Sequence, residues 1–565
     1  MAEIRSGIRK SKKRRRRIIR KLIPMLVALV LVSIVVLVAF ATGLFEQLFY
    51  SNTIADYNEY FKLENENEAA ILVGNEYLQD KAVVQNGKFY ISADVVKAYF
   101  WDDFYFDERE GCLLYTGADS TEVMTADTGA FIFSKDQLYL NADYVQQYAN
   151  IEVEVWTEPA HVEIKYKRDN IRVADATRNT KARVQGGIKS DVLTEVNEGS
   201  TVEIIEPMET WCKVKTADGF IGYIENKCLS EYREEESKEI AAPKALNITH
   251  TLRNHKIALG WHQVTNMTAN GLITSAIENT KGLNVISPTW FTLSDNEGNI
   301  ASIASSDYVN TAHAAGLEVW AVIDNFGEGI DSYEVLSYTG KRQLLINNLM
   351  QEVLGKGIDG INIDFETLDA SCAGCFPQFI RELSIPCRQN GIVLSVDNYV
   401  PKEYTEFYNR AAQGRYADYV IIMGYDEHYA GSAESGSVAS FDFVREGIEK
   451  TLEDVPASQV INGIPFYTRS WEEGAQITSN ALSMSQAQEF VRNHGIELGW
   501  NDQCAQNYGE TVENGVTYRI WMEDAQSLQV KLNLMQNNNI AGVACWKLGL
   551  ETDDVWDLIA AYMNN

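Results

Sequence analysis

The sequence predicts an α/β fold: a C-terminal (β/α)8 barrel with an insertion between its seventh and eighth strands, preceded by a small all-β barrel, a small mixed domain and one transmembrane helix. Three observations lead to this prediction. Apolar strand candidates alternate with helical runs after residue 245, short strands separated by turns fill residues 169–230, and residues 22–45 contain no charged side chain. A chain of 565 residues is long enough for several domains.

The N-terminus combines a basic tail with an apolar run. Residues 1–21 hold eleven Lys or Arg side chains and one Glu, although the whole chain has a net charge of -30. We expect a cytoplasmic tail over 1–21 and a signal anchor over 22–45 that leaves the rest of the chain outside the cell membrane. The alternative is a signal peptide cleaved after Ala41, which would give a secreted form. The acidic remainder disfavours bulk attraction to nucleic acid or to an anionic wall.

Residues 46–168 predict a small mixed domain. Strand-like runs such as 88–96, 112–117, 137–145 and 162–166 alternate with turns, and no His, Cys and Asp cluster has metal-ligand spacing. The runs 88–96 and 137–145 weakly resemble the N-terminal stalk-like domain of copper amine oxidases, a module that carries no copper itself. The resemblance implies a spacer or binding role and no cofactor.

Residues 169–230 predict a small β-barrel. The short strands 192–196, 201–205, 211–216 and 220–225 are separated by turn residues such as Glu198-Gly199 and Ala217-Asp218-Gly219. This layout resembles a bacterial SH3 domain, a module that often binds cell-wall peptides, although a spacer role is the alternative. The acidic segment 231–244 lacks an apolar period and is expected to be a linker.

Residues 245–565 predict the barrel. Eight strands are expected, with helical runs such as 342–357 between them: 256–262, 283–291, 317–326, 360–366, 392–400, 419–427, 460–467 and 541–549. The insertion is expected over Ser470 to Met522. A doubly wound open sheet is the alternative, but no phosphate-binding glycine loop follows the first strand.

The last residues of the expected strands are polar or aromatic, which suggests a carbohydrate cleft, because aromatic faces pack on sugar rings. In (β/α)8 barrels the active site lies at these strand ends. These strand ends are Trp290, Asn325, Glu366, Tyr399, Tyr425, Asp426, Tyr467 and Trp546. The candidates for substrate binding are all of them except Glu366 and Tyr425, together with Asn362 and Met423. Trp261 and Trp320 lie earlier in their strands, and we expect them in the core.

In the fourth strand, Asn362, Asp364 and Glu366 alternate with apolar residues, so all three point to one face. Two close carboxylates in a poorly hydrated pocket can keep one proton near neutral pH, which makes a general acid. A divalent cation site is the alternative, but such sites usually have more oxygen ligands, and we predict no metal. The C-x-x-C of Cys372 and Cys375 also lacks the partners of a zinc site.

Residues Asp359, Gly360, Asn362, Asp364 and Glu366 resemble the D-G-x-D-x-D-x-E strand of glycoside hydrolase family 18, the chitinase-like enzymes. Met423-Gly424-Tyr425-Asp426 resembles the M-x-Y-D of that family, and Trp546 resembles its tryptophan on the eighth strand. The resemblance implies that Glu366 protonates the leaving oxygen, that Asp364 and Tyr425 orient the 2-acetamido group that attacks the anomeric carbon, and that Trp546 forms the floor of a sugar subsite.

Two positions depart from the family pattern. Asn362 replaces an acid that normally helps relay charge below Asp364, and Val322-Ile323-Asp324-Asn325 replaces an S-x-G-G. An Asn at this point is familiar in the peptidoglycan-acting branch associated with bacterial spores. The resemblance thus implies a retaining N-acetylglucosaminidase that acts on peptidoglycan, with a chitinase or a non-catalytic glycan-binding protein as alternatives. Vegetative wall or spore cortex, and endo or exo action, stay open.

Overall fold

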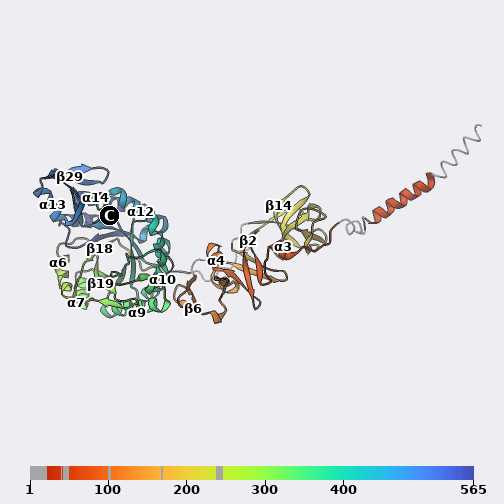
Figure 1. Cartoon of the computed structure of the whole chain (residues 1–565), viewed down its shortest axis with the longest axis horizontal. Coiled ribbons are helices and arrows are strands. Elements are labelled where there is room, and N and C mark those ends of the chain that lie inside the picture. The colour runs from red at the N-terminus through yellow and green to blue at the C-terminus, as the bar shows by residue number, and fades with distance from the viewer. Residues whose placement is uncertain are drawn as a thin grey trace, which may run out of the picture. The chain divides into compact units, whose positions relative to one another are not determined.

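The computed structural model describes residues 22–39, 41, 50–99, 104–166, 170–236 and 246–564 (Figure 1). The chain divides into two compact units. The first comprises residues up to 102 together with 126–245, and the second comprises 103–125 together with 246–565. The expected cytoplasmic tail 1–21 and residues 42–45 of the expected anchor lie outside the described residues.

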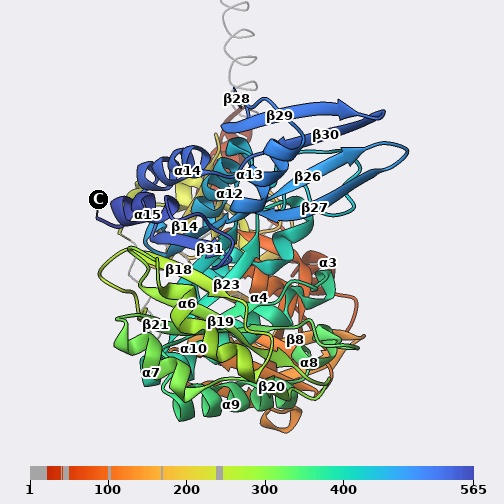
Figure 2. The same cartoon turned by 90° about the vertical axis from the view of Figure 1, so that its left-hand side faces the viewer.

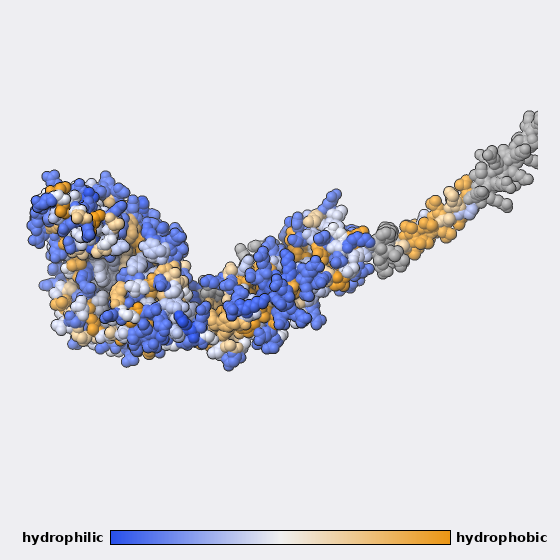
Figure 3. Space-filling view, viewed as in Figure 1, coloured by the Kyte–Doolittle hydropathy of each residue, from blue (hydrophilic) through white to orange (hydrophobic). Residues whose placement is uncertain are grey.

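Residues Leu22–Ala39 form a helix that is long and apolar enough to cross a membrane. Its mean hydropathy is 3.1 and none of it is buried. Figure 3 shows the surface of this helix as largely hydrophobic. Both an anchor and a signal peptide begin with such a helix.

The mixed domain of the first unit is built on one seven-stranded sheet with the order β7-β8-β3-β2-β1-β10-β9. Its strands are β1 (Glu68–Val73), β2 (Glu76–Gln85), β3 (Lys88–Ser92), β7 (Phe131–Ser134), β8 (Gln137–Asn141), β9 (Glu152–Thr157) and β10 (Ala160–Lys165). The runs 88–96 and 137–145 each form a strand followed by a short helix, α4 (Ala93–Tyr99) and α5 (Ala142–Tyr148). A third short helix, α3 (Tyr57–Phe61), precedes the sheet.

The expected SH3-like module is a second seven-stranded sheet, with the order β13-β12-β16-β15-β14-β11-β17. Its strands are β11 (Ile171–Asp175), β12 (Thr180–Arg183), β13 (Val192–Val196), β14 (Thr201–Pro207), β15 (Trp211–Lys215), β16 (Ile221–Glu225) and β17 (Arg233–Glu235). β17 falls within residues 231–244, which were expected to be a linker. It belongs to the module instead, because it pairs with β11 and because Arg233 forms an ion pair with Asp175. The mixed domain packs on this module through a small core that contains Phe61, Leu193 and Phe220.

A three-stranded antiparallel sheet belongs to the second unit, although its residues fall inside the mixed domain expected over 46–168. Its strands are β4 (Phe104–Asp107), β5 (Cys112–Thr116) and β6 (Thr121–Met124). It packs on helices α9 (Thr339–Lys356) and α10 (Cys375–Asn390). Nε2 of Gln378 donates to Oγ1 of Thr116 at 2.9 Å, and Nη2 of Arg388 donates to the carbonyl of Ala118 at 2.7 Å.

The core of this contact is a buried ion pair. Arg342 of α9 donates from Nε and Nη2 to the carboxylate of Glu382 in α10 at 3.2 and 3.0 Å, and both side chains are at most 1% exposed. The guanidinium also lies over the ring of Tyr105 in β4, 4.9 Å from its centroid. Two barrel helices and the added sheet therefore share one charged network, which must remain paired because it has no access to water.

The eight parallel strands expected from the sequence close into a barrel. They are β18 (Ile257–His262), β19 (Val285–Leu293), β21 (Glu318–Asp324), β22 (Gly360–Asp364), β23 (Val393–Tyr399), β24 (Tyr419–Met423), β25 (Val460–Pro465) and β31 (Gly542–Trp546). Each pairs in parallel with the next, and β18 pairs with both β31 and β19, which completes the ring. A short strand, β20 (Ile300–Ser302), extends β19 in the antiparallel sense.

The barrel interior is closed at the amino ends of the strands. The rings of Trp320 and Tyr419 stack there with centroids 5.4 Å apart, as expected for a core tryptophan. A Cβ at Gly360 would lie 2.7 Å from the Trp320 ring, so only glycine fits at the start of β22. An outer layer of helices covers the strands: α6 (Ile273–Ile277), α7 (Ser306–Ala314), α8 (Ser332–Leu336), α9, α10, α11 (Arg410–Tyr416), α12 (Phe441–Asp454), α14 (Ala525–Asn537) and α15 (Val555–Met563).

The insertion between the seventh and eighth strands is a five-stranded sheet with one helix, seen at the top of Figure 2. Its elements are β26 (Tyr467–Glu473), β27 (Ile477–Ser483), α13 (Met484–Asn493), β28 (Gly499–Asn501), β29 (Gln506–Glu513) and β30 (Val516–Trp521). It begins three residues before the expected Ser470, because β25 already ends at Pro465. Tyr467, expected as the end of a barrel strand, is thus the first residue of the insertion.

Candidate active site

A cavity of about 130 Å³ opens at the carboxyl ends of the barrel strands. Its walls come from β18, β22, β23, β24 and β31 and from the residues that follow them. The lining residues are Trp261, Asp364, Glu366, Asp397, Tyr399, Met423, Tyr425, Asp426 and Trp546. Seven of these were named as site residues from the sequence: five as strand ends, Asp364 from the alternation in the fourth strand and Met423 from the family resemblance.

Asn362 and Asp364 lie one above the other on β22. Asn362 is fully buried beneath the cavity, and Asp364 reaches it. Burial raises the pKa of Asp364 well above its ordinary value, and the nearby carboxylates of Asp397, Glu366 and Asp324 add to this effect. Asp364 therefore holds a proton under conditions in which an exposed aspartate is ionised.

The main chain of Glu366 is held on both sides. Its N–H donates to Oδ1 of Asn325 at 3.1 Å, and its carbonyl accepts from the hydroxyls of Tyr399 and Tyr408 at 3.2 Å each. Nδ2 of Asn325 in turn donates to Oγ of Ser332 at 2.8 Å. Asn325 is 2% exposed and does not line the cavity, so it positions Glu366 instead of contacting a substrate.

The carboxyl group of Glu366 is suited to hold a proton. Burial raises its pKa, a hydrogen bond with Tyr399 opposes the rise, and the charges of Asp426 and Asp324 add to it. A carboxylic acid with a raised pKa at a cavity wall can act as a general acid near neutral pH. Burial and the acids around Glu366 therefore favour its protonated form, which supplies the proton for a general acid.

Tyr425 and Asp426 line the cavity next to the insertion, whereas Tyr467, expected to bind substrate, is buried behind Asp426 and does not line it. The hydroxyl of Tyr467 donates to Oδ1 of Asp426, whose backbone has a φ of 58°. The Tyr425 and Tyr467 rings meet edge to face with centroids 6.4 Å apart. Burial raises the pKa of the Tyr425 hydroxyl well above its ordinary value, so it remains a hydrogen-bond donor.

Two tryptophans and Tyr425 form the apolar side of the cavity. The ring of Trp261 lies 5.8 Å from that of Trp546 and 6.4 Å from that of Tyr425, both edge to face. Trp261 was expected in the core. It lines the cavity because it is the last but one residue of β18, and side-chain alternation turns it into the barrel. Trp546 is half-buried and stays open on the cavity side.

Trp290 is not part of the cavity. It is 2% exposed, its Nε1 donates to Oδ1 of Asn270 at 2.8 Å, and its ring packs edge to face on Tyr308. The register of β19 shifts between Thr289 and Phe291 where this strand pairs with β21, and Trp290 packs in the core between the strands and the helices. The expectation that it binds substrate is therefore wrong.

Asp397 was missed in the sequence analysis, although a signal for it existed. In the strand Val393–Tyr399, Ser395 and Asp397 alternate with the apolar residues Leu394 and Val396, in the same way as Asn362 and Asp364 alternate with Ile361 and Ile363 on β22. Two buried polar residues on one face of a central barrel strand indicate a second row of site residues.

A wider cleft of about 960 Å³ adjoins the cavity and shares Tyr399, Met423, Tyr425 and Asp426 with it. It runs between the segment after β23 and helix α12. Two exposed aromatic side chains, Tyr404 and Tyr429, border it. A polymer could extend from the cavity along this cleft, so the arrangement fits a chain-like substrate.

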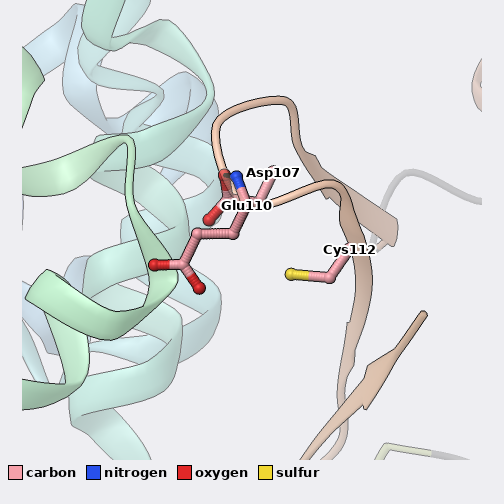
Figure 4. A group of neighbouring side chains, drawn as sticks. All are labelled: Asp107, Glu110 and Cys112. Atoms are coloured by element: carbon pink, nitrogen blue, oxygen red, sulfur yellow. Dashed lines mark hydrogen bonds between the residues drawn. The ribbon is translucent and has the colours of Figure 1, made fainter.

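Among the described residues, one further group of acids and a thiol lies close enough together to hold a metal: Asp107, Glu110 and Cys112 (Figure 4). Its carboxylates already have partners. Oδ2 of Asp107 accepts from the N–H and the hydroxyl of Thr339 at 2.6 Å each, and Oε1 of Glu110 accepts from the N–H of Gly340 at 2.7 Å. These residues cap the N-terminus of α9, whose own N-cap residue Tyr338 has no capping side-chain bond.

Comparison with known families and proteins gives a consistent result. The profile of the glycosyl hydrolases family 18 matches residues 261–551, and that of the bacterial SH3 domain matches residues 179–230. The uncharacterized glycosylase YvbX of Bacillus subtilis (strain 168) is 25% identical over 292 residues, which are 49% of this chain and 84% of that protein. The cortical fragment-lytic enzyme of the same organism is 29% identical over 238 residues, 40% of this chain and 54% of that protein.

A solved structure supports the fold. The spore cortex-lytic enzyme SleL of Bacillus cereus covers 58% of this chain and 78% of its own, with 22% identity and a TM-score of 0.50. This likeness shows the barrel architecture alone. The chain spans only about half the length of the cortical fragment-lytic enzyme, so the whole activity of that protein is not carried over from the match.

Proposed function

Because the chain belongs to glycosyl hydrolase family 18, we propose that it is a membrane-anchored extracellular glycosidase that cleaves the β-1,4 bond after N-acetylglucosamine in peptidoglycan. The observation that carries the proposal is the convergence of Asp364, Glu366, Tyr425 and Trp546 on one cavity at the carboxyl ends of the strands. The name of the cortical fragment-lytic relative supports a wall substrate.

The chemistry follows from the positions of these groups. Glu366 protonates the leaving glycosidic oxygen, since its raised pKa keeps the acid form available. The carbonyl oxygen of the substrate's own 2-acetamido group attacks the anomeric carbon, and Asp364 and Tyr425 hydrogen-bond that group. Water then opens the cyclic intermediate with Glu366 as the base, so the anomeric configuration is retained. This substrate-assisted route needs no second carboxylate as a protein nucleophile.

The substrate class is tested by product analysis. The full-length chain is incubated with peptidoglycan and with chitin oligomers, and the new reducing ends are identified by mass spectrometry. We expect N-acetylglucosamine ends from peptidoglycan, which Glu366→Gln no longer produces. Glu278→Gln, an exposed glutamate of the same unit, is the matched control and should cleave like the parent.

The outcomes separate the alternatives. Preferential cleavage of chitin oligomers would identify a chitinase instead. Binding of either polymer without new reducing ends, or equal cleavage by Glu366→Gln, would favour the non-catalytic glycan-binding protein. The acid at Glu366 argues against that alternative, because non-catalytic members of this fold usually lack it.

We also propose that the apolar helix Leu22–Ala39 anchors the protein, with the basic residues 1–21 in the cytoplasm. Membrane fractionation and protease treatment of intact cells test this topology. We expect the barrel in the membrane fraction and open to external protease. A mature N-terminus at residue 42 would instead indicate a secreted form cleaved after Ala41.

The SH3-like module is proposed to bind cell-wall peptides, in keeping with its family match. The strongly acidic chain argues against binding of an anionic wall by net charge, so recognition should rest on local hydrogen bonds and aromatic contacts. The spacer role of residues 46–168, and their resemblance to the N-terminal module of copper amine oxidases, stay predictions.

A further inference from the structure

Asp364 has a neighbour on the next strand that the assigned chemistry does not use. β22 and β23 pair in parallel with Asn362 beside Ser395 and Ile363 beside Val396, so the register sets Asp364 beside Asp397. Adjacent strands are about 4.8 Å apart, and side chains in register point to the same face. Both aspartates line the cavity, and Asp397 is 3% exposed.

The carboxyl of Asp364 is incompletely paired. Its Oδ1 is buried and has no hydrogen-bond partner among the described residues. A buried carboxylate oxygen without a donor is costly, whereas a proton shared with a second carboxyl would provide the missing bond. Asp397 on the neighbouring strand is placed to be the hydrogen-bond partner that the carboxyl of Asp364 lacks.

Asn362 fixes the orientation of Asp397. The indole Nε1 of Trp261, which can only donate, gives a hydrogen bond to Oδ1 of Asn362 at 2.9 Å, so the amide cannot be flipped. Nδ2 of Asn362 then donates to Oδ1 of Asp397 at 2.8 Å and to Oγ of Ser395 at 3.1 Å. An ionised aspartate at 362 would oppose Asp397 with like charge, whereas the amide supports it.

The surroundings favour one retained proton. Asp364 and Asp397 face the carboxylates of Glu366 and Asp324 and the hydroxyl of Tyr425, and Asp426 completes the acidic wall. No Lys, Arg or His is among the residues that line the cavity. Burial raises the pKa of both aspartates, and a close pair of carboxyls gives up its two protons in separate steps.

We propose that Asp397 is the proton partner of Asp364, and that Asn362 positions it for this role. In the free enzyme one proton lies between the two carboxyls. When Asp364 turns to accept a hydrogen bond from the substrate's amide N–H, the proton stays on Asp397, so the pair neither takes up nor releases a proton. Asp397 is thus a positioning residue that acts through Asp364. This inference deepens the proposed glycosidase function and rests on it.

The pH dependence of activity tests the proposal. In Asp397→Asn, Asp364 has no second carboxyl to take its proton when the substrate binds, so it must already be ionised. With N-acetylglucosamine oligomers as substrate, we expect the acidic limb of kcat/KM to move to higher pH by about one unit or more. The value of kcat should fall more than KM rises. An unmoved limb in a folded Asp397→Asn would overturn the proposal.

Ser395→Ala is the matched control. Ser395 lies two residues before Asp397 on the same strand and also accepts from Asn362, but it carries no carboxyl. We expect its acidic limb to stay at the position of the parent. A shift equal to that of Asp397→Asn would mean that loss of any hydrogen-bond partner of Asn362 moves the pH limb. That result would overturn the assignment of Asp397 as the proton partner.

Infrared spectroscopy keeps the test independent of turnover. The measurement uses full-length Glu366→Gln, which lacks the other carboxyl expected to hold a proton. This protein should show the band of a protonated carboxyl at neutral pH, and the band should disappear when either Asp397→Asn or Asp364→Asn is added. A band that persists in both variants assigns the proton to another group and overturns the proposal. If the parent cleaves no glycan but the band behaves as expected, the proposed function fails while the proton pair stands.

Discussion

Replacement of Asp107 by Asn should destabilise the second unit, because Asp107 links the added sheet to the barrel. Its side chain is fully buried. Oδ1 accepts from the N–H groups of Arg109 and Glu110 at 2.9 and 2.8 Å, and Oδ2 accepts the two bonds from Thr339. An asparagine has one acceptor oxygen, so its amide nitrogen must face two of these four donors.

The magnitude follows from the bonds that are lost. Two hydrogen bonds to a charged acceptor contribute about 1.5–3 kcal/mol each, so the loss is about 3–5 kcal/mol after partial relaxation. A unit of this size has an unfolding entropy equivalent to about 0.7 kcal/mol per degree near its Tm. We therefore expect Tm of the second unit to fall by about 4–7 °C, measured by calorimetry.

Glu108→Gln is the control, because Glu108 is exposed in the same turn and its replacement removes the same charge. Hydrogen exchange provides the second measurement. The amides of Thr339 and Gly340 should exchange faster than in the parent in Asp107→Asn, and at the same rate as in the parent in Glu108→Gln. If both variants melt within 1 °C of the parent, the sheet is a passive attachment and the reasoning fails.

Three further predictions concern the site and its support. Trp546→Ala should lower kcat/KM by roughly 30-fold, since an aromatic subsite wall contributes about 2 kcal/mol; a loss below threefold would contradict its contact with sugar. Asp426→Asn keeps the bond from Tyr467 but removes a charge that raises the pKa of Glu366, so the alkaline limb of kcat/KM should move to lower pH. An unmoved limb would exclude that influence. Lys531→Met leaves the buried Glu523 without its partner, which lies at 2.6 Å, and should cost about 3–5 kcal/mol in the free energy of unfolding. The double variant with Glu523→Gln should recover part of the loss in a denaturant titration.

The barrel and most of its cavity follow from local patterns. Alternation within β22 places Asn362 and Asp364 on one face whatever surrounds the strand, Glu366 follows two residues after the strand ends, and the carboxyl end of each strand is readable from its last residues. The same argument succeeds for Trp546, which ends β31, and fails for Trp290, because the shifted register of β19 was not visible in the sequence.

Contacts between distant segments were not predictable in this way. The bond from Asn362 to Asp397 joins residues on different strands, and nothing in one sequence shows which polar residue of a neighbouring strand is in register. The sequence pattern of the hairpins of residues 104–124 would be the same whichever part of the chain the sheet packed on. Their partners Thr339 and Gln378 lie more than 200 positions away, so only the three-dimensional structure assigns them to the barrel.

The chain path has a consequence for proteolytic separation of the second unit from the first. The chain enters the second unit before β4, leaves it after β6, and enters it again before β18. A single proteolytic cut between Glu236 and Leu246 therefore leaves the barrel attached, because β4, β5 and β6 still grip α9 and α10 through Asp107, Gln378 and Arg388. Shedding of an intact barrel at this level requires cuts on both sides of the small sheet as well. The noncovalent contacts of the sheet thus keep the barrel bound to the rest of the chain after a single cut.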